Sequence, residues 1–164
     1  MGNKALSPYI STALVILIGI VALTLSLTVL NPTLNKAKDS AIITEAFNNL
    51  EIIDSTIREV ASEAEDSKRT INLKVTEGTY RVDSTIDFVN FTYRMKEGLD
   101  ISGQRDNINI SIPANETNKI TLFIEYTNID LQGSDHFTKG DNSVVIMHNG
   151  TNSTTNYPFI YVGK

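Results

Sequence analysis

The stretch YISTALVILIGIVALTLSLTVL, residues 9–30, decides the architecture of this chain. It contains no charged side chain, and the uncharged region extends from Lys4 to Lys36. At about 1.5 Å per residue, a helix of this length crosses the roughly 30 Å hydrocarbon core of a bilayer. A buried globular helix rarely avoids every charge over such a length, and a secretory signal has a shorter apolar stretch of about 7–15 residues. The stretch therefore predicts a helix that enters a membrane.

The residues before this stretch form a short polar leader. Residues 1–5 are too polar to belong to the span, and Lys4-Ala5-Leu6 places a basic and then a small residue directly before the apolar run. This pattern resembles the class III signal of archaeal type IV pilin and archaellin precursors. The resemblance implies that a prepilin peptidase recognises Lys4, Ala5 and Leu6, cuts between Ala5 and Leu6, and leaves the span in the mature subunit.

One position departs from the bacterial members of that superfamily. Many bacterial pilins carry Glu at the fifth mature position, where this chain has Ile10. Archaeal members commonly lack that Glu, so the departure favours the archaeal branch. The resemblance further implies a membrane-inserted precursor and a mature form in an extracellular filament at the cell surface. Its implied partners are the membrane, copies of the same chain packed through their N-terminal helices, a pilus assembly ATPase and a membrane platform.

Beyond Pro32, apolar residues recur at intervals of three and four, which is the spacing of one face of a helix. We expect an amphipathic helix over residues 32–67, which packs on the head, on neighbouring copies, or on both. Pro32 lacks a backbone N–H, so we expect a bend or an end of the first helix near Asn31. The stripe consists of Ile43, Ala46, Leu50, Ile53, Ile57, Val60 and Ala64.

From residue 68 onward the pattern changes to the alternation of β-strands, broken by turns rich in Asn, Gly, Asp and Ser. The expected fold class is α+β, with a long N-terminal helix followed by an antiparallel, β-rich, sandwich-like head. The expected organisation is a leader at 1–5, a hydrophobic transmembrane or filament-core helix at 6–31, an amphipathic helix at 32–67 and an extracellular head at 68–164. Candidate strands include Ile71 to Val75, Tyr80 to Met95, Ile108 to Ile112, Ile120 to Tyr126, Val144 to Met147 and Phe159 to Val162.

Five Asn-x-Ser/Thr sequons lie in the expected head and none precedes it. Such sequons are acceptors for N-glycosylation outside the membrane, so they favour a secreted glycoprotein head. Asn90 and Asn109 lie inside expected strands, so their side chains need to face solvent, and the sequons expected in loops, Asn115, Asn149 and Asn152, are favoured over them. The five asparagines are Asn90, Asn109, Asn115, Asn149 and Asn152.

Composition and motifs argue against catalysis and against nucleic-acid binding. The 14 basic and 19 acidic residues give a net charge of −5, which is unsuited to gripping phosphates. There is no cysteine, and His136 and His148 have no metal-binding spacing around them, so each is expected at the surface or in a loop. The oxygen-rich segment 135–142 is a poor match to a calcium loop and is expected to be a turn. We expect no enzyme activity, no cofactor and no metal site.

Three functions remain open at this point. The first is a structural subunit of an extracellular type IV pilus-like filament, serving assembly and surface adhesion. The second is a single-pass membrane protein whose extracellular head binds a ligand and never polymerises. The third is a minor pseudopilin that primes or caps such a machine. Leader cleavage separates the first from the second, and subunit abundance separates the first from the third.

Overall fold

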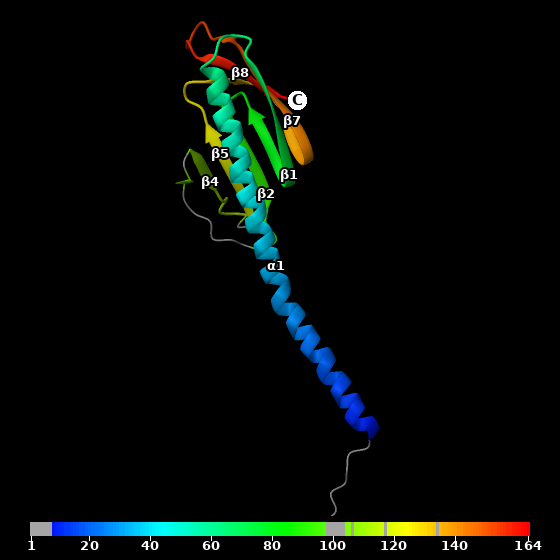
Figure 1. Cartoon of the computed structure of the whole chain (residues 1–164). Coiled ribbons are helices and arrows are strands. Elements are labelled where there is room, and N and C mark those ends of the chain that lie inside the picture. The colour runs from blue at the N-terminus through cyan, green and yellow to red at the C-terminus, as the bar shows by residue number, and fades with distance from the viewer. Residues whose placement is uncertain (1–7, 98–103, 106, 117, 134) are drawn as a thin grey trace, which may run out of the picture.

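The computed structural model describes residues 8–97, 104–105, 107–116, 118–133 and 135–164. One long helix, α1 (Pro8–Ala61), is followed by a head built of strands (Figure 1). The lower part of α1 projects from the head, and its upper part lies along the sheet (Figure 1). The strands are β1 (Lys68–Asp83), β2 (Phe88–Arg94), β3 (Gln104–Arg105), β4 (Ile108–Ser111), β5 (Lys119–Glu125), β6 (Asp130–Gln132), β7 (His136–Thr151) and β8 (Pro158–Gly163).

Helix α1 runs through Pro32 without a break, so of the two expectations for this position the end of the first helix is wrong, and a bend there stays a prediction. Pro32 has no backbone N–H, so one hydrogen bond of the helix is missing at this point. The helix also ends at Ala61, earlier than the expected limit at 67. Asp66 has a positive φ of 69°, and strand β1 begins two residues later at Lys68.

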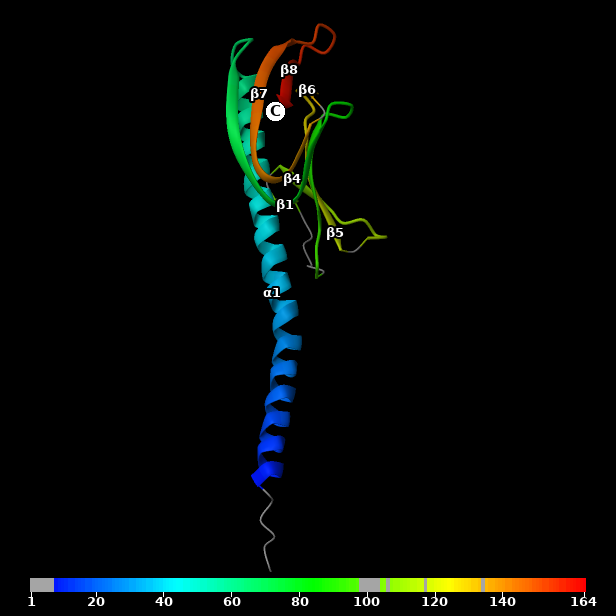
Figure 2. The same cartoon turned by 90° about the vertical axis from the view of Figure 1, so that its right-hand side faces the viewer.

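The strands form a single eight-stranded sheet in the order β3-β4-β5-β2-β1-β7-β8-β6. All pairings are antiparallel except that of β6 with β8, which is parallel. The α+β class is therefore confirmed. Within it, the second layer of the head is the upper part of α1, which lies on one face of the sheet (Figures 1 and 2).

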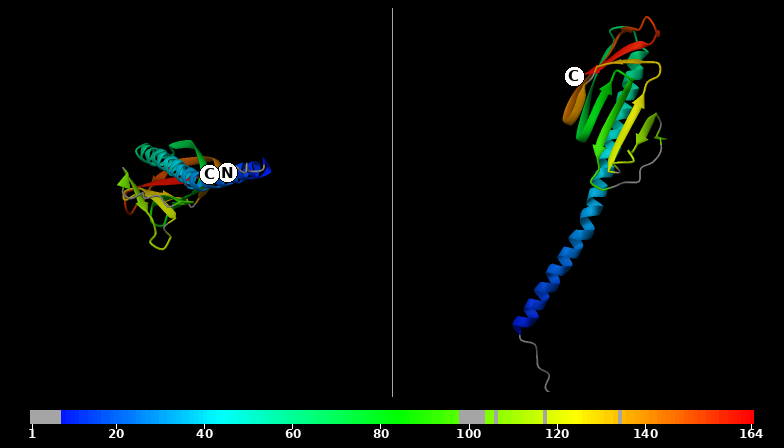
Figure 3. Two further views of the ribbon diagram at one scale, coloured as in Figure 1. Left: turned by 90° about the horizontal axis from the view of Figure 1, so that it is seen from below. Right: turned by 180° about the vertical axis from the view of Figure 1, so that it is seen from behind.

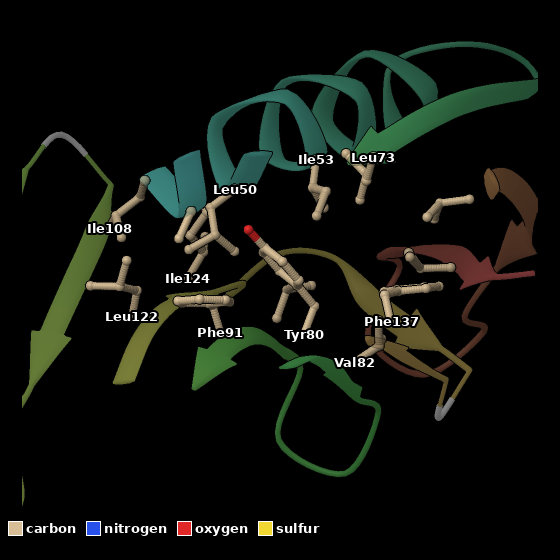
Figure 4. Close-up of a cluster of buried hydrophobic side chains, with 14 of the residues drawn as sticks. Leu50, Ile53, Leu73, Tyr80, Val82, Phe91, Ile108, Leu122, Ile124 and Phe137 are labelled. Carbon is tan, nitrogen blue, oxygen red and sulfur yellow. The ribbon is translucent and has the colours of Figure 1, made fainter. Parts of the chain in front are cut away.

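The helical stripe and the inward face of the sheet share one hydrophobic core (Figure 4). Leu50, Ile53 and Ile57 are fully buried, as the spacing predicts. Ala64 lies beyond the helix end and is exposed. Since burying a large aliphatic side chain contributes roughly 1.5–3 kcal/mol, this stripe is a main source of stability for the head. From the sheet, the core includes Leu73, Tyr80, Val82, Phe91, Ile108, Leu122, Ile124 and Phe137, which are labelled in Figure 4.

Several sheet features differ from the sequence expectation. The segment 135–142, expected to be a turn, contributes most of its residues to β7, which pairs with β1 along much of its length. His148 also lies in β7 and is only 6% exposed, so the surface or loop position expected for it is wrong. Ile86, expected in a strand, lies in the turn between β1 and β2 and is exposed. The short strands β3 and β6 had no alternation long enough to predict them.

Strand β1 changes register at a bulge between Val75 and Thr79. Across it the buried positions switch from odd to even numbers, from Leu73 and Val75 to Tyr80 and Val82. The bulge contains Gly78, whose φ is 92° and whose added Cβ would lie 2.4 Å from the ring of Phe91. Both the backbone conformation and the close approach therefore require glycine at this position.

We predict that Gly78→Ala destabilises the protein much more than Gly140→Ala. Both glycines have positive φ, 92° and 124°, but a Cβ at Gly140 meets nothing within 4 Å. Gly140→Ala should therefore cost only the backbone strain, about 1–3 kcal/mol. Gly78→Ala adds a clash with Phe91 and should cost roughly 1–3 kcal/mol more. Urea unfolding of the full chain in detergent micelles measures both, and equal losses would contradict the packing at the bulge.

Candidate functional site

The projecting half of α1 is the most unusual surface of the molecule. Large apolar side chains are exposed on every side of it, including Leu17 at 60%, Ile20 at 59% and Leu25 at 62%. An apolar window of 18 residues within α1 has a mean hydropathy of 2.8, and none of it is buried. A helix that is apolar all round belongs in lipid or in a protein interior. By length and composition, α1 is able to cross a membrane.

Three hydroxyl side chains within this apolar half bond to the helix itself. Thr24 Oγ1 donates to the carbonyl of Ile20 at 2.9 Å, and Ser26 Oγ donates to the carbonyl of Ala22 at 2.9 Å. Thr28 Oγ1 is held in the same way, on the carbonyl of Leu25 at 2.7 Å. These bonds satisfy the hydroxyl donors without water, so the three polar side chains are compatible with an apolar environment.

The apolar half ends where the head begins to cover the helix. After Lys4, the next charged residues are Lys36, Lys38 and Asp39. Asp39 is also the first buried residue of α1 among those whose burial the structure describes. The boundary between apolar and charged sequence therefore coincides with the boundary between the bare helix and the covered helix.

At this boundary Asp39 holds the segment that follows β2. Its carboxylate is fully buried and accepts a hydrogen bond from Tyr93 Oη at 2.6 Å. It also accepts hydrogen bonds from the backbone N–H groups of Lys96 and Glu97, each at 2.9 Å. We call Asp39, Tyr93, Lys96 and Glu97 the neck clasp. Burial raises the pKa of Tyr93, and the bond it donates to Asp39 raises it further, so the phenol stays protonated.

Two further contacts fix the helix to β1 near the neck clasp. Lys38 Nζ lies 2.6 Å from Glu77 Oε1. Glu45 accepts hydrogen bonds from both the backbone N–H and the hydroxyl of Thr76, at 2.8 and 2.6 Å. Hydrogen bonds to charged groups are stronger than neutral ones, so the Glu45–Thr76 pair adds to the attachment of the helix to β1, whereas the exposed Lys38–Glu77 pair adds little. No motif in the sequence singled out Asp39, because its partners lie more than 50 residues away in the chain.

The structure separates the sequon asparagines by their surroundings. Asn90 lies in β2 and Asn109 in β4, both half-buried, whereas Asn115 is exposed in a turn. Asn149 was expected in a loop but lies in β7, where it is exposed. Asn152 directly follows that strand and is half-buried. Modification of all five stays a prediction.

Two other sequence features belong here. The leader residues Lys4, Ala5 and Leu6 lie outside the described residues. Among the described residues, no group of three His, Asp or Glu side chains is arranged to hold a metal ion. His136 is exposed at the start of β7, and the buried His148 lies further along the same strand.

Comparisons with known proteins found no match for this chain among protein-family models, curated proteins or solved structures.

We predict that Asp39→Ala lowers the free energy of unfolding and weakens the attachment of residues 96–97 to α1. The change leaves the Tyr93 hydroxyl and two backbone N–H groups without their acceptor, at a cost of roughly 3 kcal/mol or more. Glu77→Ala is the control, because it removes a surface ion pair with Lys38 that contributes at most about 1 kcal/mol. Urea unfolding and limited proteolysis near residue 96 report the effect. If both variants lose the same small amount of stability, Asp39 does not hold the neck.

Proposed function

We propose that this chain is the structural subunit of an extracellular type IV pilus-like filament, with roles in assembly and surface adhesion. The observation that carries the proposal is the division of one continuous helix into two halves. The upper half is buried against the sheet, and the lower half exposes apolar side chains on all sides. The class III pattern at Lys4, Ala5 and Leu6 is independent support from the sequence.

The lower half can leave water in two ways, by entering lipid or by packing against other copies of itself. Removing apolar surface from water is worth about 25 cal/mol per Å², so either environment strongly favours this helix. In the proposed cycle the precursor first rests in the bilayer. The mature subunit then exchanges lipid for the apolar helices of its neighbours.

Exchange of one apolar environment for another supplies little net driving force, because lipid is as apolar as the helices. The work of extraction therefore falls to partners, which the resemblance identifies as an assembly ATPase and a membrane platform. A prepilin peptidase first removes the leader. The head contributes no chemistry to these steps and is carried outward on the helix.

The neck clasp gives the polymer its geometry in this proposal. Asp39 and the neighbouring contact of Glu45 with Thr76 help to fix the head on the helix axis. The spacing of packed helices in the filament core then sets the spacing of heads on its surface. If the head could rotate freely on the helix, the heads would have no fixed positions on the filament surface.

We predict that Ile20→Asp abolishes filaments while sparing membrane insertion. A charge near the middle of a span costs about 2.5–3.5 kcal/mol on insertion scales, which a long apolar helix tolerates. In a filament, every subunit would bury the same charge against the apolar helix of an adjacent subunit, where no water or counter-ion solvates it. Assembly should therefore fail. Ile57→Asp is the comparison: Ile57 is fully buried in the head core, so this change should unfold the head.

The measurement is the amount of each variant in sheared filaments, in membranes and after protease treatment of the head. Ile20→Asp should be lost only from the sheared fraction, and Ile57→Asp should also lose protease resistance. If wild-type protein never enters the sheared fraction in a host that expresses the assembly machinery, a membrane-anchored binding module is the better assignment. Sheared filaments that contain the chain only in trace amounts would indicate a minor pseudopilin.

We also predict that the mature protein begins at Leu6. A retained Lys4 would place a charge where the helices pack in an apolar core, and that burial is costly for an unpaired ion. Replacing Lys4 or Ala5 should therefore leave uncut precursor in the membrane. Intact-mass measurement of filament protein tests this, and filaments built from chains that retain residues 1–5 would refute the class III assignment.

A further inference from the structure

The sheet face that α1 leaves uncovered carries an apolar hollow of about 440 Å³. This face is turned toward the viewer in the right-hand view of Figure 3. Ile86 is 59% exposed at the hollow, and Phe88 and Phe123 are half-buried in it. Apolar side chains grouped in one hollow favour contact with a small apolar surface of another molecule. The lining residues are Ile86, Phe88, Asn90, Ser111, Thr121, Phe123 and Glu125.

One residue of this lining is a sequon asparagine, and the strand register sets its neighbours. Asn90 in β2 is directly opposite Phe123 in β5, and Phe123 is directly opposite Asn109 in β4. Directly opposed residues have Cβ atoms about 4.5–5.5 Å apart. Phe88 precedes Asn90 by two positions and therefore shares its face of the sheet. Asn90 thus has two aromatic residues as neighbours on the uncovered face, Phe123 across the strand pair and Phe88 along its own strand.

The side-chain amides of the sequons differ in what they bind. Asn149 Nδ2 donates to Gln132 Oε1 at 2.7 Å, and Asn152 Nδ2 donates to Asp130 Oδ2. In the part of the chain that the structure describes, no hydrogen bond engages the side-chain amides of Asn90, Asn109 and Asn115, and of these three Asn90 alone lines the hollow. The fold therefore engages the side-chain nitrogens of Asn149 and Asn152 in hydrogen bonds, whereas Asn90 lines the hollow with its side-chain nitrogen unbonded.

We propose that Asn90 carries an N-linked glycan whose first sugar lies in this hollow against Phe88 and Phe123. The donor is a sugar linked to a lipid phosphate, and a membrane glycosyltransferase catalyses the transfer. A bond forms between Asn90 Nδ2 and C1 of the sugar as the bond from C1 to the phosphate oxygen breaks. The amide nitrogen gives up one proton, and the lipid phosphate leaves.

The hollow suits a sugar because its lining has aromatic rings for the apolar face of the sugar and oxygen atoms for its hydroxyl groups. A pyranose ring has an apolar face of C–H groups, which packs on an aromatic ring and removes apolar surface of both from water. Its hydroxyl rim needs hydrogen-bond partners, and Ser111, Thr121 and Glu125 present oxygen atoms in the lining. Ile86 is covered at the same time. A glycan in this position thus converts an exposed apolar hollow into a closed surface.

This inference requires only that the head reaches a compartment in which chains are N-glycosylated. It does not require polymerisation. If the protein forms no filaments, the glycan proposal still stands. If Asn90 carries no glycan, the filament proposal still stands.

The test uses the full chain from cells that N-glycosylate surface proteins, with the same chain from non-glycosylating cells as reference. Glycopeptide mass spectrometry should find Asn90 modified. Asn90→Gln should lower the Tm of the glycosylated protein by about 4 °C, the shift expected for one aromatic contact in a domain of this size. In the protein from non-glycosylating cells, Asn90→Gln should leave the Tm unchanged.

The contact itself is tested by repeating Asn90→Gln in two backgrounds. Phe123→Ala removes one wall of the hollow, and the loss of Tm on Asn90→Gln should disappear there. Phe159→Ala removes another half-buried phenylalanine, in β8, that does not line the hollow, and the loss should persist. An unmodified Asn90, or an equal loss of Tm in both backgrounds, would overturn the proposal.

Discussion

The packing of the α1 stripe on one face of the sheet is the interaction on which the rest of the structure depends. It supplies the second layer of the head and the inner wall of the core. It also forces the helix to project, because the lengths do not match. A helix of 54 residues is about 81 Å long, whereas even the longest strands, β1 and β7 of 16 residues each, span at most about 53 Å. A single sheet of this size cannot cover such a helix, so part of α1 needs another environment.

The sequence places the transition between these environments at one short segment. Apolar side chains on all sides give way to charge at Lys36, Lys38 and Asp39, and burial against the head begins at the same point. A buried carboxylate is costly unless it is fully hydrogen-bonded, and the neck clasp meets that condition with one hydroxyl and two backbone donors. Asp39, whose charge is costly to bury, thus contributes to holding the head on the helix.

Periodic features of the fold were predictable from the sequence, and features set by distant partners were not. The helical stripe and most strands have repeats of 3.6 or 2 residues, which reflect a buried face. The switch in buried positions at the bulge around Gly78 interrupts that repeat, so the pattern alone does not show that β1 continues through it. β6 is too short to show a repeat, and its pairing with β8 joins segments far apart in the chain. The continuation of α1 through Pro32 could not be predicted from the proline alone, because the same residue is compatible with an end or with a bend of the helix. The neck clasp has no local signature at all.

The two faces of the sheet have different roles in the proposed filament. The inner face is sealed by α1, and the projecting half of α1 is occupied by lipid or by neighbouring helices. The uncovered face is therefore the part of the sheet left to meet the surroundings, and it is there that strand alternation sets Asn90 and Asn109 on either side of Phe123. Alternation that points Val89 and Phe91 into the core necessarily points Phe88 and Asn90 outward. The same period of two that builds the core thus builds the hollow, and a one-residue slip of β2 would destroy both.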